Sequence, residues 1–297
     1  MSSPLILCYM KRMYKRVYIE ISNICNLQCS FCPIVDRDNK VLEVDNFQKI
    51  IKQVAPITKE VCLHLMGEPI AHPHFSKVID ICTNLNVPIQ LTTNGVVIAQ
   101  KKHILLKDNS IRQVNFSIQS YKDNFPDRPL KDYLIPIFEF SDELYKKRPD
   151  IYINYRLWNL KENEEVDNDE FFDLLESYFN IEVNRRIQVE AIKSKKLREK
   201  LYLHFDSRFN WPDFDLPMLG TGGRCHGLIS HIGIHADGTV VPCCLDKEAR
   251  ISLGNCLEQD LREILSSERA MKMKIGFQNN QLVEDLCQRC PYIRRFN

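Results

Sequence analysis

Between about residues 17 and 192, short β-branched and apolar runs alternate with longer stretches whose apolar positions recur about every 3.6 residues. This alternation is typical of parallel βα units, in which each strand is followed by a covering helix. The predicted strands are VYIEIS (17–22), VCLHLM (61–66), PIQLTT (88–93), QVNFSI (113–118), IYINYRL (151–157) and RIQVEAI (186–192). Predicted helices include 44–57, 75–85 and 134–147.

Six βα units are too few for a closed eight-stranded barrel but suit an open one. We therefore expect an α/β fold, a partial (β/α)6 barrel whose functional residues lie at the carboxyl ends of the strands.

The pattern changes after residue 195. Residues 196–222 are first charged and then loop-like, which indicates a connector. The segment HIGIHADGTVVPCC (231–244) predicts a hairpin with Asp237 and Gly238 at its turn, and residues 257–275 predict a helix. We expect a barrel over residues 1–195, the connector, and a small α+β domain over 223–297.

Charge and hydropathy narrow the functional class. The 297 residues carry 40 Lys and Arg against 39 Asp and Glu, a formal net charge of +1. Such a balance lacks the basic footprint of a nucleic-acid-binding protein, so a nucleic-acid partner is not expected. The apolar stretch near the start is too short for a signal-peptide core or a membrane span. We expect a cytoplasmic protein without a membrane partner.

Twelve cysteines need a chemical explanation. A cytosol keeps thiols reduced, so metal ligation is a better account than a disulfide framework. Three cysteines, Cys25, Cys29 and Cys32, lie together after the first predicted strand, and six more lie between Cys225 and Cys290. Two groups of cysteines predict two metal sites.

The spacing of the cysteines in the first group distinguishes between two kinds of metal site. A structural zinc site needs a fourth ligand nearby, and no Cys or His follows Cys32 for some thirty residues. Three thiolates leave a four-iron cluster one ligand short, and the open iron can bind a substrate. The spacing favours the cluster, with zinc as the alternative.

The segment ISNICNLQCSFCP resembles the cluster loop of the radical S-adenosylmethionine (SAM) superfamily, C-x3-C-x-aromatic-C, with Phe31 at the aromatic position. This resemblance implies a [4Fe-4S] cluster on Cys25, Cys29 and Cys32 that binds SAM.

Three further segments resemble motifs of the same family, in the family's order. LMGEP resembles the turn that holds the amino group of SAM, LTTNGV resembles its TNG segment, and FSIQS resembles the segment near the ribose, with a glutamine where an acidic residue is common. In addition, the guanidinium of Arg156, at the end of the fifth predicted strand, suits the SAM carboxylate, with a purely structural arginine as the alternative. The cofactor-binding residues implied are Phe31, Gly67, Glu68, Pro69, Thr93, Asn94, Ser117, Gln119 and Arg156.

The C-terminal cysteines resemble the auxiliary-cluster domain called SPASM or, in its shortened one-cluster form, twitch. The six cysteines favour the shortened form. The resemblance implies a second [4Fe-4S] cluster, for which zinc is the alternative. The expected ligands are Cys225, Cys243, Cys287 and Cys290, with Cys244 as the substitute for Cys243. The other cysteines, Cys256, Cys8, Cys62 and Cys82, are interpreted as buried thiols.

The family resemblance implies an enzyme that reductively cleaves SAM to a 5′-deoxyadenosyl radical and abstracts hydrogen from a substrate. Because only about 16 residues precede the first predicted strand, a small-molecule substrate is favoured. The hypotheses are a lyase acting on a modified base such as queuine and a sugar or cyclitol dehydrogenase. A peptide- or protein-modifying enzyme is the alternative, and a structural iron–sulfur or zinc protein is the non-enzyme alternative. An electron donor such as flavodoxin or ferredoxin is expected. The sequence assigns no catalytic acid or base.

Overall fold

The computed structural model describes residues 14–107, 109–160, 168–185 and 193–296. Within these ranges, a ten-stranded sheet has the order β10-β9-β8-β1-β2-β3-β4-β5-β7-β6. Its strands are β1 (Tyr14–Ile19), β2 (Thr58–Cys62), β3 (Ile89–Thr93), β4 (Ile111–Ser117), β5 (Tyr152–Leu160), β6 (Ser194–Arg198), β7 (Leu201–Ser207), β8 (His231–Ile234), β9 (Thr239–Val241) and β10 (Gly254–Asn255).

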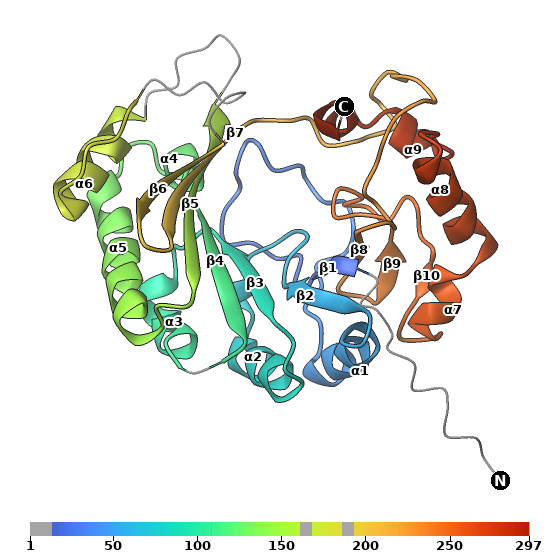
Figure 1. Ribbon diagram of the computed structural model, residues 1–297, viewed down its shortest axis with the longest axis horizontal. Coiled ribbons are helices and arrows are strands. Elements are labelled where there is room, and N and C mark those ends of the chain that lie inside the picture. Colours follow the sequence, from blue (N-terminus) through green and yellow to red (C-terminus); the bar gives the residue numbers. More distant parts are fainter. Residues whose placement is uncertain (1–13, 108, 161–167, 186–192, 297) are drawn as a thin grey trace.

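The sheet curves, and the helices that follow its first strands lie on its outer side (Figure 1). The helices are α1 (Val44–Val54), η1 (Pro69–Ala71), α2 (Phe75–Asn84), α3 (Ile98–Leu105), α4 (Ser120–Asn124), α5 (Leu130–Lys147), α6 (Asp169–Phe179), α7 (Leu261–Leu265), α8 (Glu268–Gln278), α9 (Asp285–Gln288) and η2 (Pro291–Phe296). The predicted fold class, an open α/β barrel built on parallel strands, is confirmed.

Helix α1 shows why these segments cover the sheet. Its buried side chains are Phe47, Ile50, Ile51 and Val54, which recur at the spacing of one helix face. The predicted helices at 44–57 and 75–85 correspond to α1 and α2, and the third begins earlier than predicted, at Leu130. The single helix predicted over 257–275 is instead two, because α7 ends with Ser266 as its C-cap and the Ser267 side chain caps the start of α8 by accepting from the Ala270 amide.

The first two strands begin and end about three residues before their predicted bounds. The predicted strand at 17–22 corresponds to β1, and the one at 61–66 to β2. Tyr14 is fully buried at the start of β1, although it stands among basic residues in the sequence. The apolar residues that follow each strand lie in the loops that form the functional site. The apolar runs in the sequence therefore continue beyond the last residue of each strand.

The sixth predicted strand, 186–192, lies outside the described residues. The strand that pairs with β5 in parallel is β7, inside the segment interpreted as a connector. Its Leu201, Leu203 and Phe205 are buried and alternate with more exposed residues. This alternation is the signal of a strand that the charged residues of the preceding β6 obscured.

The C-terminal segment joins the same sheet through β8, which pairs with β1 in parallel. Val17 lies opposite Ile232, and Ile19 lies opposite Ile234. The predicted hairpin is confirmed: β8 and β9 are antiparallel, and Gly238 has the positive φ of +90° that its turn requires. Strand β1 therefore pairs with both the barrel and the C-terminal segment.

Among the helices of the described residues, none has the combination of length and apolar composition needed to cross a lipid bilayer.

Ile232→Ala tests whether the C-terminal segment and the barrel unfold together. Because Ile232 is fully buried, its truncation to alanine is expected to lower the free energy of unfolding by about 2–5 kcal/mol. Because β8 is a strand of the common sheet, urea transitions followed by circular dichroism and by tryptophan fluorescence should shift together.

The control is Ile275→Ala, since Ile275 is 52% exposed on α8 and should change stability by less than about 0.5 kcal/mol. A separate low-denaturant transition affected by Ile232→Ala alone would mean that the C-terminal segment unfolds independently.

Candidate functional site

The loop that carries the first three cysteines begins directly after β1 and is closed at its base. Ser22 pairs with Val41, and the Asn23 amide donates to the Lys40 carbonyl over 3.1 Å. At the tip, the Cys32 amide donates to the Cys29 carbonyl over 3.0 Å. The hydrogen bond between the Cys29 and Cys32 thiols lowers the pKa of Cys29 and raises that of Cys32. The three predicted ligands are free thiols on one short loop.

Helix α4 holds this loop from the barrel side, through two residues that the sequence analysis did not identify. The Asn124 side chain accepts from the Gln28 amide over 2.7 Å and donates to Cys29 Sγ over 3.2 Å. Asp123 accepts from both the amide and the hydroxyl of Ser30. The only sequence signal was the position of these residues shortly after the FSIQS segment.

The turn at Gly67 packs directly against the start of the cysteine loop. A Cβ at this position would lie 2.2 Å from the Ser22 carbonyl oxygen, and Gly67 has a φ of +74°. The next amide, that of Glu68, donates to the Ile24 carbonyl over 3.0 Å. Both the conformation and the close approach require glycine here.

The Glu68 carboxylate is buried and joins this turn to the end of β3. Oε1 accepts from the Thr93 hydroxyl over 2.6 Å, and Oε2 accepts from the Asn94 amide over 2.7 Å. Asn94 Nδ2 lies 3.8 Å from Cys25 Sγ and donates to Asn26 Oδ1 over 2.8 Å. Burial raises the pKa of Glu68 to about 7, and no cation of the described residues forms a salt bridge with this carboxylate.

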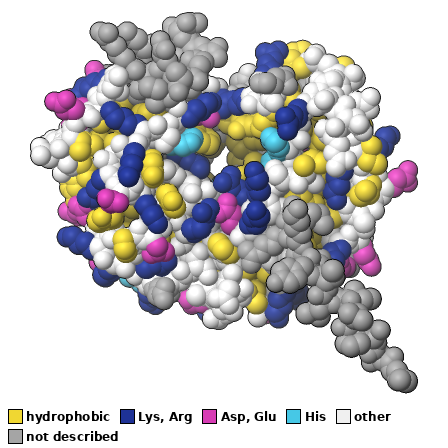
Figure 2. Space-filling view, in the orientation of Figure 1, with side chains coloured by type: hydrophobic (Ala, Val, Ile, Leu, Met, Phe, Trp, Pro, Cys, Tyr) yellow, Lys and Arg dark blue, Asp and Glu magenta, His cyan; other side chains and the backbone are white. Residues whose placement is uncertain are grey.

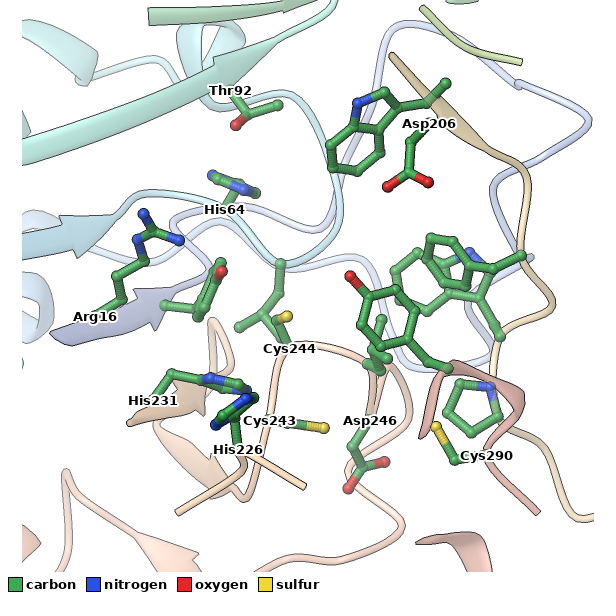
Figure 3. A pocket seen from close by; sticks show the side chains of 18 of the residues that line it. Arg16, His64, Thr92, Asp206, His226, His231, Cys243, Cys244, Asp246 and Cys290 are labelled. Carbon is green, nitrogen blue, oxygen red and sulfur yellow. The ribbon is translucent and has the colours of Figure 1, made fainter. Parts of the chain in front are cut away.

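A cavity of about 700 Å³ lies beside these segments. Figure 3 shows part of its lining. Among the predicted residues of the barrel, Phe31, Cys32, Ser117, Gln119 and Arg156 line it directly. The others, Cys25, Cys29, Gly67, Glu68, Pro69, Thr93 and Asn94, are not among its lining residues. Of these, Gly67, Glu68, Thr93 and Asn94 support the cysteine loop as described above. On the face shown in Figure 2, the molecule is hollowed near its middle, with Lys and Arg side chains around the opening.

Arg156 is set into the wall of this cavity. Its guanidinium lies 4.5 Å from the centre of the Trp158 ring, and its Nη1 donates to the Thr92 hydroxyl over 3.3 Å. Within the described residues, no carboxylate forms a salt bridge with it. Burial lowers the pKa of Arg156 to about 10, so the group stays cationic at neutral pH.

The C-terminal cysteines line the same cavity from the opposite side, at Cys225, Cys243, Cys244, Cys287 and Cys290. Burial and then neighbouring cysteines raise the pKa of Cys243 and of Cys287. The cysteines acting on Cys243 include Cys225 and Cys287, and Cys290 acts on Cys287. All four predicted ligands thus line the same cavity and influence one another electrostatically.

Two other cysteines of this region have different partners. Burial raises the pKa of the Cys244 thiol to about 11, and the neighbouring Tyr18 hydroxyl, from the barrel strand β1, opposes this rise. Cys256 is 2% exposed, and its thiol donates to the Gly238 carbonyl over 3.2 Å. These contacts favour Cys243 over Cys244 as a metal ligand and agree with the interpretation of Cys256 as a buried thiol.

The spacing of the ligands bears on the kind of metal. In the described part of the chain, no three Cys, His, Asp or Glu side chains converge closely enough to surround a single ion. Four thiolates on one tetrahedral zinc would lie about 3.8 Å apart, given Zn–S bonds of about 2.3 Å. A four-iron cluster binds each thiolate to a different iron and so spaces them more widely. The thiolate donors themselves are of the kind that iron–sulfur clusters use.

The uncompensated groups of the cavity region fit SAM. Its amino-acid part is a zwitterion, and the site offers a buried carboxylate, Glu68, and a buried guanidinium, Arg156, that lack charged partners among the described residues. Gln119 Oε1 is buried without a hydrogen-bond partner there and could accept from a hydroxyl. Within the described ranges, Glu68 and Arg156 have hydrogen bonds but no opposite charge, whereas Gln119 Oε1 lacks even a hydrogen bond, and a buried polar atom left in that state indicates a ligand.

Comparison with solved structures shows the same fold in two enzymes. BtrN in complex with AdoMet and 2-DOIA has a TM-score of 0.59 at 12% identity, with 95% of this chain and 94% of that chain covered. Streptococcus suis SuiB bound to precursor peptide SuiA has a TM-score of 0.60 at 16% identity, with 95% and 71% covered.

Curated relatives match a shorter stretch. PqqA peptide cyclase of Bradyrhizobium diazoefficiens is 27% identical over 115 residues, which are 38% of this chain and 30% of the relative. GTP 3′,8-cyclase of Synechocystis sp. is 27% identical over 126 residues, 40% of this chain and 38% of the relative. The chain thus spans about a third of the length of these relatives.

Two family matches cover both parts of the site. Residues 225–291 match the iron-sulfur cluster-binding domain SPASM, and residues 19–175, more than half of the chain, match the radical SAM superfamily. The cofactors are accordingly a [4Fe-4S] cluster and SAM, with additional iron–sulfur chemistry in the C-terminal part, which confirms the expectation from the cysteine motifs. The chain belongs to the radical SAM superfamily.

Proposed function

We propose that this protein reductively cleaves SAM and uses the resulting radical to abstract hydrogen from a small molecule. When bound, the reduced cluster and SAM supply methionine and a 5′-deoxyadenosyl radical, which removes hydrogen from an unactivated carbon. No side chain can supply this chemistry, so the protein binds, orients and shields the reactants.

Cys25, Cys29 and Cys32 are the proposed ligands of the SAM-binding cluster. Glu68 receives the SAM ammonium, and its burial strengthens this interaction because few waters compete. Arg156 holds the SAM carboxylate through its planar fork. Asn94 and Gln119 contribute neutral hydrogen-bonding groups, and Phe31 and Ser117 form part of the wall.

The observation that carries the proposal is one cavity that is lined by Cys32 of the first cysteine group and by five cysteines of the second. Its volume of about 700 Å³ lies within the usual range for sites that enclose small molecules. A substrate bound there lies between the SAM side, at Cys32 and Arg156, and the auxiliary side, at Cys243 and Cys290. This placement suits SAM together with one small substrate.

The lining of the inner wall indicates a polar substrate. Gln90, Gln113 and Asn154 contribute neutral amides from β3, β4 and β5. His64 also lines the cavity (Figure 3), and its buried Nδ1 has no partner among the described residues. Burial and then Arg156 lower the pKa of His64 to about 3, so the ring is neutral. Such groups suit a sugar or cyclitol undergoing dehydrogenation, or a modified base such as queuine undergoing cleavage by a lyase.

A peptide substrate is the second candidate. SuiB was solved bound to a precursor peptide, and another relative is a PqqA peptide cyclase. These likenesses favour a ribosomal-peptide or protein modifier over the small-molecule enzyme if the cavity admits an extended chain.

We further propose one auxiliary cluster, on Cys225, Cys243, Cys287 and Cys290. The remaining two C-terminal cysteines have other contacts, with Tyr18 and with the Gly238 carbonyl, so ligands for a second auxiliary cluster are lacking between 223 and 296. This is the one-cluster twitch form of the domain. A cytoplasmic location and an electron donor such as flavodoxin or ferredoxin complete the proposal.

Anaerobic reconstitution with iron and sulfide tests the cofactor assignment. The wild type should bind about eight irons per chain, and a Cys25/Cys29/Cys32→Ala variant about four, since each [4Fe-4S] cluster is lost as a unit. With dithionite and SAM, the wild type should release 5′-deoxyadenosine and the variant should release none, as measured by chromatography.

Two further variants separate the C-terminal ligands from their neighbours. Cys287→Ala should lower the iron content to about four per chain, whereas the matched control Cys256→Ala should retain about eight. Four irons with one zinc in the wild type would make the C-terminal site structural. An absence of both iron and 5′-deoxyadenosine would contradict the proposed function.

Deuterium transfer tests the substrate class. C-deuterated myo-inositol, glucose, queuine and a deuterated peptide mixture are each supplied with SAM and dithionite, and 5′-deoxyadenosine is analysed by mass spectrometry. Deuterium should come from a polyol or from queuine. His64→Ala should reduce this transfer at least about tenfold because it removes a wall contact, whereas His103→Ala, on α3, should not.

Transfer from peptides alone would establish the alternative substrate class. Equal transfer by His64→Ala and the wild type would exclude a substrate contact at His64.

A further inference from the structure

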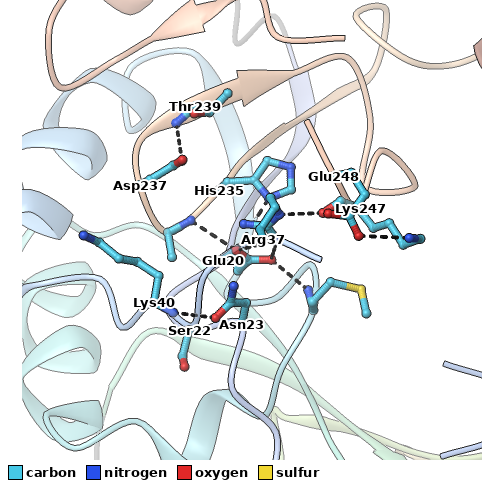
Figure 4. A network of polar contacts seen from close by, with 12 residues as sticks. Glu20, Ser22, Asn23, Arg37, Lys40, His235, Asp237, Thr239, Lys247 and Glu248 are labelled. Carbon is cyan, nitrogen blue, oxygen red and sulfur yellow. Dashed lines mark hydrogen bonds and ion pairs between the residues drawn. The ribbon is translucent and has the colours of Figure 1, made fainter. Parts of the chain in front are cut away.

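A single buried carboxylate, that of Glu20, lies where the parts of the site meet (Figure 4). Glu20 directly follows β1, and its side chain is fully buried. Its amide donates to the Ile234 carbonyl over 2.8 Å, which continues the pairing of β1 with β8. Burial raises the pKa of Glu20, but His235 and Arg37 lower it more, so the group is ionised at neutral pH.

The carboxylate contacts three segments that are far apart in the sequence. Arg37 Nη2 donates to both oxygens, over 3.1 Å to Oε1 and 2.9 Å to Oε2. The Met66 amide donates to Oε2 over 3.3 Å, and the Ala236 amide donates to Oε1 over 3.2 Å. His235 Nδ1 lies 3.5 Å from Oε1.

Each of these segments carries part of the functional site. Arg37 belongs to the loop with the first three cysteines, and Met66 directly precedes the Gly67 turn. Ala236 follows β8 in the C-terminal part. Neither Glu20 nor Arg37 lines the cavity, so both act on the site through the backbone that they hold.

Additional contacts attach the second half of the cysteine loop to the C-terminal part. Arg37 Nε donates to the Lys247 carbonyl over 2.7 Å, and Lys247 Nζ donates to the Ile34 carbonyl over 3.0 Å. The Asp36 amide donates to Glu248 Oε1 over 3.0 Å. Residues 246–248 closely follow Cys243, so this attachment links the two cysteine groups.

We propose that Glu20 is the positioning residue that aligns the cysteine loop with the Gly67 turn and makes this alignment depend on the C-terminal part. The proposal rests on the proposed function, because the aligned elements are those assigned to the cluster and to SAM. Glu20 thereby controls SAM binding without contacting SAM.

A carboxylate is required for chemical reasons. Its two oxygens both accept, so it can satisfy the Ala236 amide on one side and the Met66 amide on the other while pairing with Arg37. A glutamine has one accepting oxygen, and its NH₂ group would face one of the two amides donor to donor. Glu20→Gln therefore loosens one of the three segments while keeping nearly the same volume.

The test compares Glu20→Gln with Glu60→Gln in the reconstituted protein. Glu60 is a matched control because it is also buried and also pairs with two arginines, Arg16 over 2.7 Å and Arg112 over 2.6 Å, but it contacts neither the cysteine loop nor the Gly67 turn. The readouts are iron per chain, the SAM dissociation constant, the electron paramagnetic resonance spectrum of the reduced cluster with SAM, and KM against kcat for 5′-deoxyadenosine formation.

Glu20→Gln should raise the SAM dissociation constant and KM at least about tenfold and alter the spectrum of the SAM-bound cluster. Glu60→Gln should lower the melting temperature with a SAM affinity within about twofold of wild type. Loss of about four irons from Glu20→Gln alone would also support the proposal, since it would show that the loop needs this carboxylate. Arg37→Met, which releases only the loop, is the second variant and should weaken SAM binding in the same direction.

Wild-type SAM affinity in Glu20→Gln and Arg37→Met, with full iron content, would overturn the proposal. So would equal losses of affinity in Glu20→Gln and Glu60→Gln, which would indicate a general effect of stability. A wild-type protein that forms no 5′-deoxyadenosine would instead contradict the proposed function, so the two failures are distinguishable.

Discussion

The parallel pairing of β1 with β8 joins the barrel and the C-terminal segment around one cavity. Strand β1 has a barrel strand on one side and a C-terminal strand on the other. The chain after β1 forms the first cysteine loop, and the hairpin after β8 leads to Cys243 and Cys244. Because neighbouring parallel strands end at the same edge of a sheet, the first cysteine loop meets the turn after β8 there, and β9 then runs back antiparallel to β8 before the chain reaches the two cysteines. The Glu20 carboxylate occupies this meeting point, and its burial is possible because arginine and backbone donors surround it.

The charges of the site follow from the same arrangement. The carboxyl group of Glu68, after β2, and the guanidinium of Arg156, on β5, are both buried in the barrel. Among the described residues, neither has a charged partner. Keeping such groups buried and unpaired is costly, so a fold that retains them is prepared for a ligand with both charges. By contrast, Asp206 and Glu60, near the same cavity or strands, are already paired with arginines. The presence or absence of a charged partner thus distinguishes the charged side chains that stabilise the fold from those available to a ligand.

The features that could be predicted from the sequence are those that depend on residues close together along the chain. Cys25, Cys29 and Cys32 could be assigned because their spacing on one loop is itself the ligand pattern, and the DG turn of the β8–β9 hairpin followed from its backbone requirement. The open barrel followed from periodicity. The strand at 201–207 was missed because the basic residues of β6 next to it resemble a solvated connector, although alternate positions of β7 are buried.

The residues that align the site could not be found in this way. Glu20 contacts Arg37, Met66 and Ala236, which are 17, 46 and 216 residues distant along the chain, and Asn124 reaches Cys29 across 95 residues. A lone glutamate at a strand end carries no local sign that it will be buried among donors. Its role arises only when the folded sheet places three distant segments of the chain around its carboxylate. In this protein the cofactor ligands are encoded locally, whereas the geometry that makes them act together is encoded by the order of the strands.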